Sequence, residues 1–380
     1  MTYDLLIKNG RVLDPASGLD DLMDVAVKGN RIEDVAHKIE TNNAAQVIDA
    51  KGLLVTPGFI DMHAHAFYLG DLGLGKDLEA ACYPSCVTSL VDGGSAGAAT
   101  FPGFREYIIE PSRIRIFSFL HISSIGLADI DVGESTYLTL HDPQRAADTA
   151  NANRDVILGI KVRQQAEAVG ENGVEPLRLA KKAASLAGGL PVMVHVTHPP
   201  VPLSEILELL GPGDIVSHFL HGRGHGILNA KGEIFPEVIR AREDGVVFDV
   251  GHGRFHVSFD VARAAIAQRF LPDTISTDLT RGGRESVVKD LSHTLSKFLN
   301  LGLDIETVIA CATSNPARVL NKSEAIGTLK KGAFADIAVF GLESGDFTFQ
   351  DTEAQVLKGS VHIAPKHTIQ NGRVVWQKKG

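Results

Sequence analysis

The stretch Pro57-Gly-Phe-Ile-Asp-Met-His-Ala-His65 decides how this chain is expected to fold. It closes an apolar run, residues 55–62, that we predict to be a buried β-strand. Because side chains alternate along a strand, His63 and His65 point to one face, where both imidazoles can bind a single metal ion. Alone, two histidines at this spacing are a weak signal, since such a pair also occurs by chance in loops.

Seven more apolar runs follow, and helix-periodic segments separate them. This alternation is typical of βα units and of a parallel sheet. Eight strands within the segment 56–325 favour an α/β fold of the closed (β/α)8 TIM barrel type over an open doubly wound sheet. The seven further runs are residues 87–91, 114–120, 156–162, 192–196, 215–218, 246–250 and 275–278.

Both ends of the chain consist of short β-type runs that Gly, Asn and Asp turns separate. We place one turn at Asn9-Gly10 and another at Asn371-Gly372, because Asn-Gly is a strong hairpin signal. Segments 1–55 and 326–380 contain no long helix-periodic stretch. They are therefore predicted to combine into one small β-sandwich domain beside the barrel.

The composition is that of a globular protein that buries a large core. Of the 380 residues, 44% are hydrophobic and 22% are charged, and the formal net charge is -9. This charge argues against nucleic acid or an anionic membrane surface as partner, and no apolar stretch has the length of a membrane helix. Three cysteines and an N-terminus without the features of a secretory signal predict a cytoplasmic protein.

Three further ligand-type residues stand at the ends of predicted strands: His195, His218 and Asp278. Barrel enzymes place their active sites at the C-terminal ends of their strands. A single histidine after an apolar run is more often a structural residue than a ligand. Three such residues at three strand ends are harder to explain in that way, because each is costly to bury unless it is paired or metal-bound.

Lys161 interrupts the run of residues 156–162, which otherwise reads as a fully buried strand. An ion pair or a side chain that reaches the solvent would explain an isolated lysine in an arbitrary strand. The other explanation is chemical: burial lowers the pKa of a lysine, and its neutral amine can add CO₂ to form a carbamate. A carbamate has two oxygens and one negative charge, so it can bridge two cations.

Taken together, these features resemble the binuclear members of the amidohydrolase superfamily. The resemblance rests on the 57–65 motif, on the ligand-type residues that follow in the family's order, and on residues 315–320 and 327–339, and it covers almost the whole chain. Six positions of this sequence match the family's metal ligands: His63, His65, Lys161, His195, His218 and Asp278.

The resemblance implies two divalent metal ions in the barrel. The first two histidines and the aspartate would hold the more buried ion, and the last two histidines would hold the more exposed one. The lysine, carboxylated by CO₂ at its side-chain nitrogen, would bridge the ions together with a hydroxide. Nitrogen and carboxylate ligands favour Zn²⁺, although manganese, cobalt or iron could also bind.

The resemblance also implies a reaction, in which the bridging hydroxide attacks a carbonyl group. Asp278 would be both a ligand and the general base that passes a proton to the leaving group; pure ligation is the alternative. The length of the chain, residues 159–163 and the loop after His218 are most similar to a dihydroorotase-like branch with deacetylase activity. That branch acts on acetyl esters or amides of α-substituted carboxylic acids, such as acetylated hydroxy or amino acids.

Two other functions stay open at this stage. A cyclic amidohydrolase of the dihydroorotase, hydantoinase or dihydropyrimidinase type would use the same six ligands and differ only in its pocket loops. A non-catalytic scaffold of the same fold is the third possibility. Such relatives typically lack ligands, and the presence of all six argues against it.

The substrate-binding residues are predicted from their place near the barrel mouth. Arg163 lies two residues beyond Lys161 and could bind a substrate carboxylate through its planar fork, although an ion pair that supports the site explains it equally well. The loop after His218 and the neighbouring strand ends add four more candidates. These are Arg223, His221, Tyr68 and His252. The expected partner is thus a small-molecule carboxylate, and the family resemblance implies a homo-oligomer.

Overall fold

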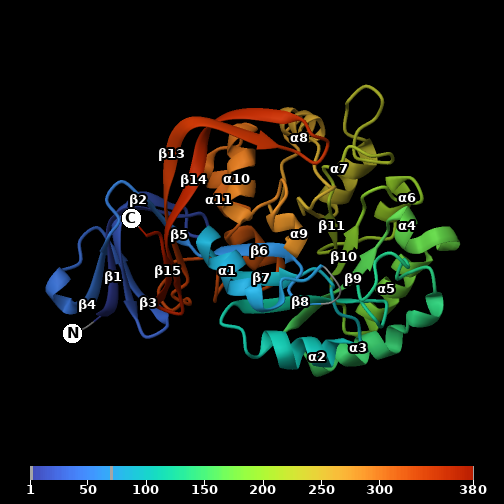
Figure 1. Ribbon diagram of the computed structural model, residues 1–380, viewed down its shortest axis with the longest axis horizontal. Coiled ribbons are helices and arrows are strands. Elements are labelled where there is room, and N and C mark those ends of the chain that lie inside the picture. The colour runs from blue at the N-terminus through green and yellow to red at the C-terminus, as the bar shows by residue number, and fades with distance from the viewer. Residues whose placement is uncertain (1–2, 69–71, 380) are drawn as a thin grey trace.

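The computed structural model describes residues 3–68 and 72–379 of the chain (Figure 1). A barrel of parallel strands surrounded by helices forms one part of it. A separate β-sheet built from both ends of the chain lies beside this barrel. The predicted combination of a (β/α) barrel with a small β domain from the two termini is therefore confirmed.

The barrel contains seven regular parallel strands that pair in chain order, each with the next. Their residues are buried almost without exception, because helices cover the outer face and side chains fill the inner one. These strands match seven of the eight predicted runs. They are β6 (Phe59–Ala64), β7 (Val87–Asp92), β8 (Arg115–His121), β9 (Ile157–Arg163), β10 (Val192–His195), β11 (Ile215–Ser217) and β12 (Val247–Asp249).

The eighth side of the barrel is an irregular segment, residues 274–279, and the predicted regular strand 275–278 is wrong. Isolated parallel bridges join Thr274 to Asp249 on one side and Leu279 to Ala64 on the other. Asp278 has a positive φ of 49°, which an extended strand does not allow. The segment nevertheless closes the barrel, since it spans the gap between β12 and β6.

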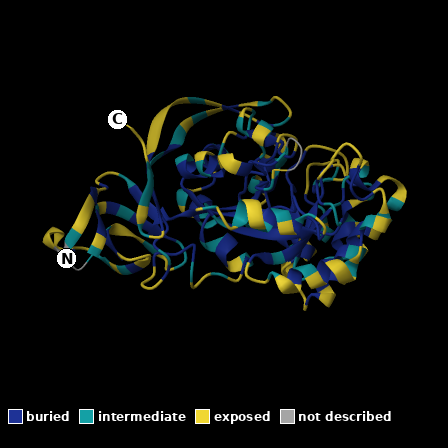
Figure 2. Ribbon diagram, turned by 60° about the horizontal axis from the view of Figure 1, so that its bottom comes forward, coloured by how far each residue is buried: buried dark blue, intermediate teal, exposed yellow. Residues whose placement is uncertain are grey.

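Helices cover the outside of the barrel, with their small apolar residues turned inward and their polar residues exposed (Figure 2). In α5, for example, Leu177, Ala180 and Ala184 are buried at helical spacing. No helix in the described part of the chain combines the length and the apolarity needed to cross a membrane. The helices are α1 (Leu78–Cys82), α2 (Phe101–Phe104), α3 (Pro143–Ala152), α4 (Ala166–Val169), α5 (Glu175–Leu186), α6 (Leu203–Leu207), α7 (Pro236–Glu243), α8 (Phe259–Ala267), α9 (Arg281–Arg284), α10 (Leu291–Asn300), α11 (Ile305–Ala310) and α12 (Ser314–Val319).

The terminal domain is one mixed sheet with the strand order β15-β14-β13-β5-β1-β2-β3, and β4 pairs with β1. Strands from the two ends of the chain meet where β13 pairs with β5. A separate apolar core, which includes Ile7, Val27 and Ile337, stabilises this sheet. Its strands are β1 (Tyr3–Asp14), β2 (Leu19–Lys28), β3 (Arg31–Ala36), β4 (Ala44–Asp49), β5 (Leu54–Pro57), β13 (Ile337–Gln350), β14 (Val356–Gln370) and β15 (Arg373–Gln377).

Two local predictions need correction. The predicted strand 55–62 is split, because β5 belongs to the terminal sheet and β6 to the barrel. The chain passes from one to the other at Gly58, where a Cβ atom would lie 2.4 Å from the hydroxyl oxygen of Thr88. The Asn9-Gly10 turn is wrong as well, since β1 continues through it with a bulge and Asn9 has a φ of 60°. The Asn371-Gly372 turn, by contrast, connects β14 and β15 as predicted.

The β13–β14 hairpin is much longer than the sheet to which it belongs. Near its base both strands pair within the terminal sheet. Toward its tip the hairpin extends over the barrel, packs on α10 and reaches the region of α8 (Figure 1). The terminal domain thus contacts the barrel far from its own sheet.

Candidate metal centre

The polar ends of the barrel strands surround a cavity of about 390 Å³. Five of the six residues predicted as metal ligands line it. The sixth, His218, packs against His195 and His256, with ring centroids 4.2 and 4.1 Å away. Leu72, Leu127 and Phe255 contribute apolar walls. A pocket with an apolar wall and a polar floor is typical of a small-molecule site.

One group of possible ligands consists of His63, His65 and Asp278. His63 lies on β6, His65 follows it directly, and Asp278 belongs to the irregular eighth segment. The Nε2 atom of His65 is 3.0 Å from Oδ1 of Asp278, and that of His63 is 3.6 Å from the same oxygen. Two imidazole nitrogens and a carboxylate oxygen thus converge at one point, which is a donor set that suits Zn²⁺.

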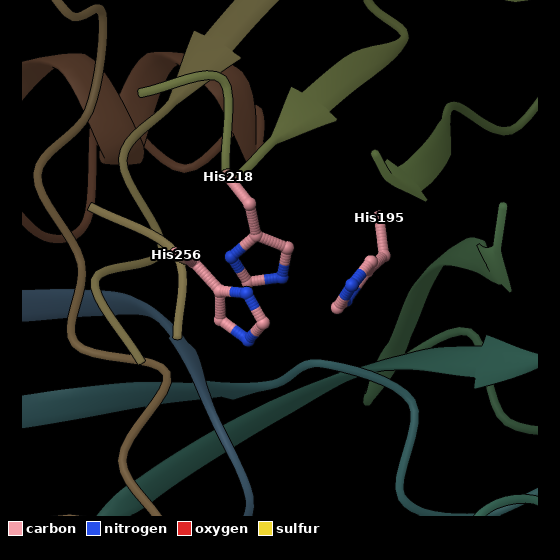
Figure 3. A group of neighbouring side chains, drawn as sticks. All are labelled: His195, His218 and His256. Carbon is pink, nitrogen blue, oxygen red and sulfur yellow. The ribbon is translucent and has the colours of Figure 1, made fainter. Parts of the chain in front are cut away.

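A second group consists of three buried histidines, His195, His218 and His256 (Figure 3). His218 and His256 lie side by side with ring centroids 4.1 Å apart, and His195 faces them from β10. Within the described residues, Nε2 of His195 and Nε2 of His218 have no hydrogen-bond partner. Buried polar atoms are normally paired, so two orphaned lone pairs directed at one place fit a cation.

Lys161 lies between these groups and is only 1% exposed. Its Nζ atom is 3.1 Å from Nε2 of His63. Burial lowers the pKa of Lys161 to about 8, even though the carboxylates of Asp278 and Asp249 act to raise it. A lysine with this pKa has a fraction of neutral amine near neutral pH, which is the form that reacts with CO₂.

Burial also keeps the histidines neutral. It lowers the pKa of His63 to about 4, with a further contribution from the nearby Lys161. It places the pKa values of His195 and His218 well below their usual range. Neutral imidazole is the form that binds a metal ion, so this centre needs little proton release to take one up.

Two series of hydrogen bonds fix the orientation of His63 and His65. Nδ1 of His63 lies 2.8 Å from Oγ of Ser217, and that hydroxyl donates to Asp249 over 2.7 Å. A serine hydroxyl has one hydrogen, so Ser217 accepts from His63, whose Nδ1 must therefore be protonated. The Nε2 lone pair of His63 then faces the cavity.

A second chain of hydrogen bonds, at the end of β7, repeats this arrangement for His65. Nδ1 of His65 lies 2.8 Å from Oγ of Ser95, and Ser95 donates to Asp92 over 2.7 Å. In the same way, Nδ1 of His218 lies 2.6 Å from the carbonyl oxygen of Gly251. Each of these contacts leaves Nε2 free for a metal, which is the usual role of groups behind metal-binding histidines.

The two oxygens of Asp278 face different partners. Oδ1 faces His63 and His65, whereas Oδ2 lies 3.4 Å from Nε2 of His256. Burial acts to raise the pKa of Asp278, but the neighbouring His256 and His65 outweigh it, and this pKa lies well below its usual range. Asp278 is therefore ionised and has one oxygen beside the possible ligands and one beside His256.

His256 is a site residue that the sequence did not single out. It lies in the loop after β12, and its Nδ1 is 2.8 Å from the hydroxyl of Thr197. Asp92, Ser95, Ser217 and Asp249 were also missed, although each stands at or just after a strand end, where the rule that found the ligands would have found them.

Arg163 lines the cavity, but other protein groups already bind it. One terminal nitrogen of its guanidinium group is 3.0 Å from the buried carboxylate of Glu134, and the other is 2.8 Å from Gln165. Arg223 also lines the cavity, together with Arg254, which was not among the predicted site residues. In the described part of the chain, neither of these two arginines has an acidic partner.

Three of the predicted substrate-binding residues do not line the cavity. His221 is 2% exposed and its Nδ1 accepts a hydrogen bond from the backbone of Arg223. His252 is fully buried and contacts Lys297. The side chain of Tyr68 points to solvent and its hydroxyl accepts a hydrogen bond from Arg281. These residues follow strand ends as predicted, but the loops turn their side chains away.

Comparison with known proteins identifies relatives over the full chain. A model of the amidohydrolase family matches residues 144–375, and a second model with the same description matches residues 46–82. A deacetylase of Agrobacterium fabrum is 38% identical over 349 residues, which cover 91% of this chain and 85% of the relative. A deacetylase of Enterococcus faecalis is 30% identical over 384 residues, with 98% and 99% covered.

Solved structures agree with these relatives. The crystal structure of an adenine deaminase matches with a TM-score of 0.92 and 30% identity, and it covers 99% of this chain and 100% of that one. The crystal structure of a dihydroorotase matches with a TM-score of 0.87 and 33% identity, with 98% and 97% covered. This chain therefore belongs to the amidohydrolase family and is a hydrolase.

Proposed function

We propose that this protein is a binuclear metal-dependent hydrolase that removes the acetyl group from esters or amides of α-substituted carboxylic acids. The observation that carries the proposal is the convergence of the six ligand-type residues, with Lys161 fully buried among them. The deacetylases of similar sequence supply the choice of acetyl group. Acetylated hydroxy acids and acetylated amino acids are both in the proposed range.

The residues present suit two divalent cations, for which Zn²⁺ is our choice. His63, His65 and Asp278 would hold one ion, His195 and His218 the other, and carboxylated Lys161 would bridge them. Such ions polarise a carbonyl group and make a hydroxide nucleophile available near neutral pH. The low pKa of Asp278 and the neutral histidines support this assignment.

Asp278 is the proposed general base. Its Oδ2 atom lies near His256, whereas Oδ1 faces His63 and His65. A carboxylate oxygen in this position can take a proton and return it to the leaving group. His256, fixed by its contact with Thr197, keeps Oδ2 in place.

Arg223 and Arg254 are the proposed partners of the substrate carboxylate. They belong to the loops after β11 and β12, and both lie near the ring of Phe255, at 6.0 and 5.3 Å from its centroid. Glu134 already neutralises Arg163, so Arg163 is the weaker choice for an anion. Phe255 is 50% exposed and offers an apolar surface for the α-substituent.

A cyclic amidohydrolase of the dihydroorotase type is the second candidate, and the structural similarity to a dihydroorotase favours it. The two functions require the same metal centre and differ in the group that the pocket accepts. The test is a parallel assay of metal-loaded protein on N-acetyl and O-acetyl α-substituted acids and on dihydroorotate. Hydrolysis of acetylated acids with little turnover of dihydroorotate supports the proposal, and the reverse preference contradicts it.

A further inference from the structure

Lys297 is a fully buried lysine on α10, outside the metal centre. Its Nζ atom has three close neighbours: Nε2 of His252 at 2.8 Å, the carbonyl oxygen of Val287 at 2.6 Å and that of Gln350 at 2.9 Å. An ammonium group has three donors, and these three acceptors satisfy them all. Lys297 therefore joins three segments that are far apart in the sequence.

The orientation of His252 fits this role. Its Nδ1 atom lies 2.9 Å from the carbonyl oxygen of Gly253, so Nδ1 carries the proton and Nε2 accepts from Lys297. A lysine in this setting is costly to bury, and burial lowers the pKa of Lys297 to about 7. A methionine or leucine would fill the same space without that cost, so packing alone does not explain why a lysine is buried here.

The second segment is the tip of the β13–β14 hairpin, to which Gln350 belongs. Next to it, Oδ2 of Asp351 accepts from the backbone N–H of Phe259 over 2.8 Å, at the start of α8. The backbone and the hydroxyl of Thr352 both donate to the carbonyl oxygen of Val257. The tip of the terminal domain is thus attached to the end of the loop that precedes α8 and to the first residue of that helix.

That loop, residues 250–257, forms one wall of the cavity and carries Arg254, Phe255 and His256. Its beginning lies against the eighth segment, because Gly253 donates to the carbonyl oxygen of Thr277 over 2.9 Å. A Cβ atom on Gly253 would lie 2.5 Å from Oδ2 of Asp278. A small movement of this loop therefore reaches the proposed base directly.

We propose that Lys297 is a positioning residue, which acts through His252 and the hairpin tip to hold the 250–257 loop against Asp278. The terminal domain then has a task in the active site, namely to fix the cavity wall that faces the substrate. This inference rests on the proposed function only for its kinetic readout. Hydrogen exchange tests the contacts themselves whether or not the enzyme turns over a substrate.

The test compares the metal-loaded wild-type enzyme with Lys297→Met, which keeps the side-chain length and removes the donors. We expect kcat/KM to fall by at least about tenfold, with KM rising. A displaced cavity wall misorients the substrate and slows the reaction even when no contact to the reacting atoms is lost. Metal content should stay unchanged. Hydrogen exchange should quicken in residues 250–257 and 350–355 and not elsewhere.

The matched control is Lys358→Met, which removes an exposed lysine from the same hairpin and should leave KM and exchange unchanged. Thr352→Val removes the hydroxyl hydrogen bond to Val257 at the tip and should change KM and exchange in the same direction, so a Lys297 variant that fails to fold does not end the test. A double variant should lose little more than either single one. Lower thermal stability with normal KM and normal loop exchange would overturn the proposal. If no substrate is hydrolysed by the wild type, the exchange experiment still decides it, and only the proposed function fails.

Discussion

The Nζ atom of Lys161 lies 3.1 Å from Nε2 of His63, inside a barrel floor where both side chains are almost fully buried. Two basic groups at this distance repel each other when both are protonated, and burial together with the nearby Lys161 lowers the pKa of His63 to about 4. Carboxylation of Lys161 would replace this repulsion by an anion that binds cations.

Replacing Lys161 by Ala should remove most of the bound metal and the activity, because the variant lacks the bridging anion. Adding short carboxylates such as acetate or propionate should restore part of both. Metal analysis and initial rates, with and without the carboxylate, check this. A fully active Lys161→Ala enzyme would refute the bridge.

Replacing Asp278 by Asn should separate its role as general base from its role as metal ligand. An amide oxygen can still coordinate, so metal should remain bound, but it cannot take a proton, and kcat should drop by about 10²–10⁴-fold. Metal stoichiometry and kcat are measured on the same preparation. Near-normal kcat with normal metal would show that Asp278 is a ligand only.

Replacing Ser95 or Ser217 by Ala should weaken metal binding by about 10–100-fold, since each serine fixes the orientation of one histidine. Competition with a chelator gives the dissociation constants. Ser185→Ala, an exposed serine on α5, serves as the control. Equal affinities in all the variants would mean that the histidines are held without the serines.

Replacing Arg223 or Arg254 by Gln should raise KM for an acetylated acid by about tenfold, because a charge-assisted hydrogen bond to its carboxylate is lost. The corresponding methyl ester of that acid, which lacks the charge, should be affected much less. Arg263→Gln, an exposed arginine on α8, is the matched control. An equal rise in KM for the acid and for its methyl ester would show that these arginines do not bind the carboxylate.

Buried histidines outside the centre should make the protein sensitive to acid. Burial lowers the pKa of His141 to about 4, whereas an unfolded histidine has a pKa of about 6.5. Between these values the unfolded state binds the extra proton, so stability falls as the pH falls from 6.5 to 4, by up to about 3 kcal/mol for this group.

Urea unfolding at several pH values in that window measures the effect. A His141→Gln variant should lose less stability between pH 6.5 and 4.5 than the wild type, while His37→Gln, an exposed histidine, should keep the wild-type slope. Identical slopes for all three proteins would show that His141 is not responsible.

Much of this site was predictable because of one physical regularity. Parallel strands of a barrel are apolar until they end, so a ligand-type residue at the end of an apolar run stands out. His195 at the end of β10 and Lys161 within β9 were found in this way. The apolar pattern likewise predicted seven of the barrel strands, since burial on both faces leaves continuous runs.

The features that were missed depend on loop conformation, which no periodicity encodes. His252 and His256 are four positions apart in one loop, and the turn between them sends the first to Lys297 and the second to the cavity. Glu134 pairs with Arg163 from a loop that lies far away in the sequence. The left-handed backbone of Asp278 breaks the eighth strand, although its side chain lies where the ligand was expected.

The most direct test of the central claim is a Zn²⁺ titration of metal-free protein, with kcat/KM for an acetylated α-substituted carboxylic acid measured at each step. Our account predicts that activity is absent without metal and reaches its maximum at two ions per chain. Full activity in the metal-free protein, or a maximum at one ion, would contradict a binuclear hydrolase.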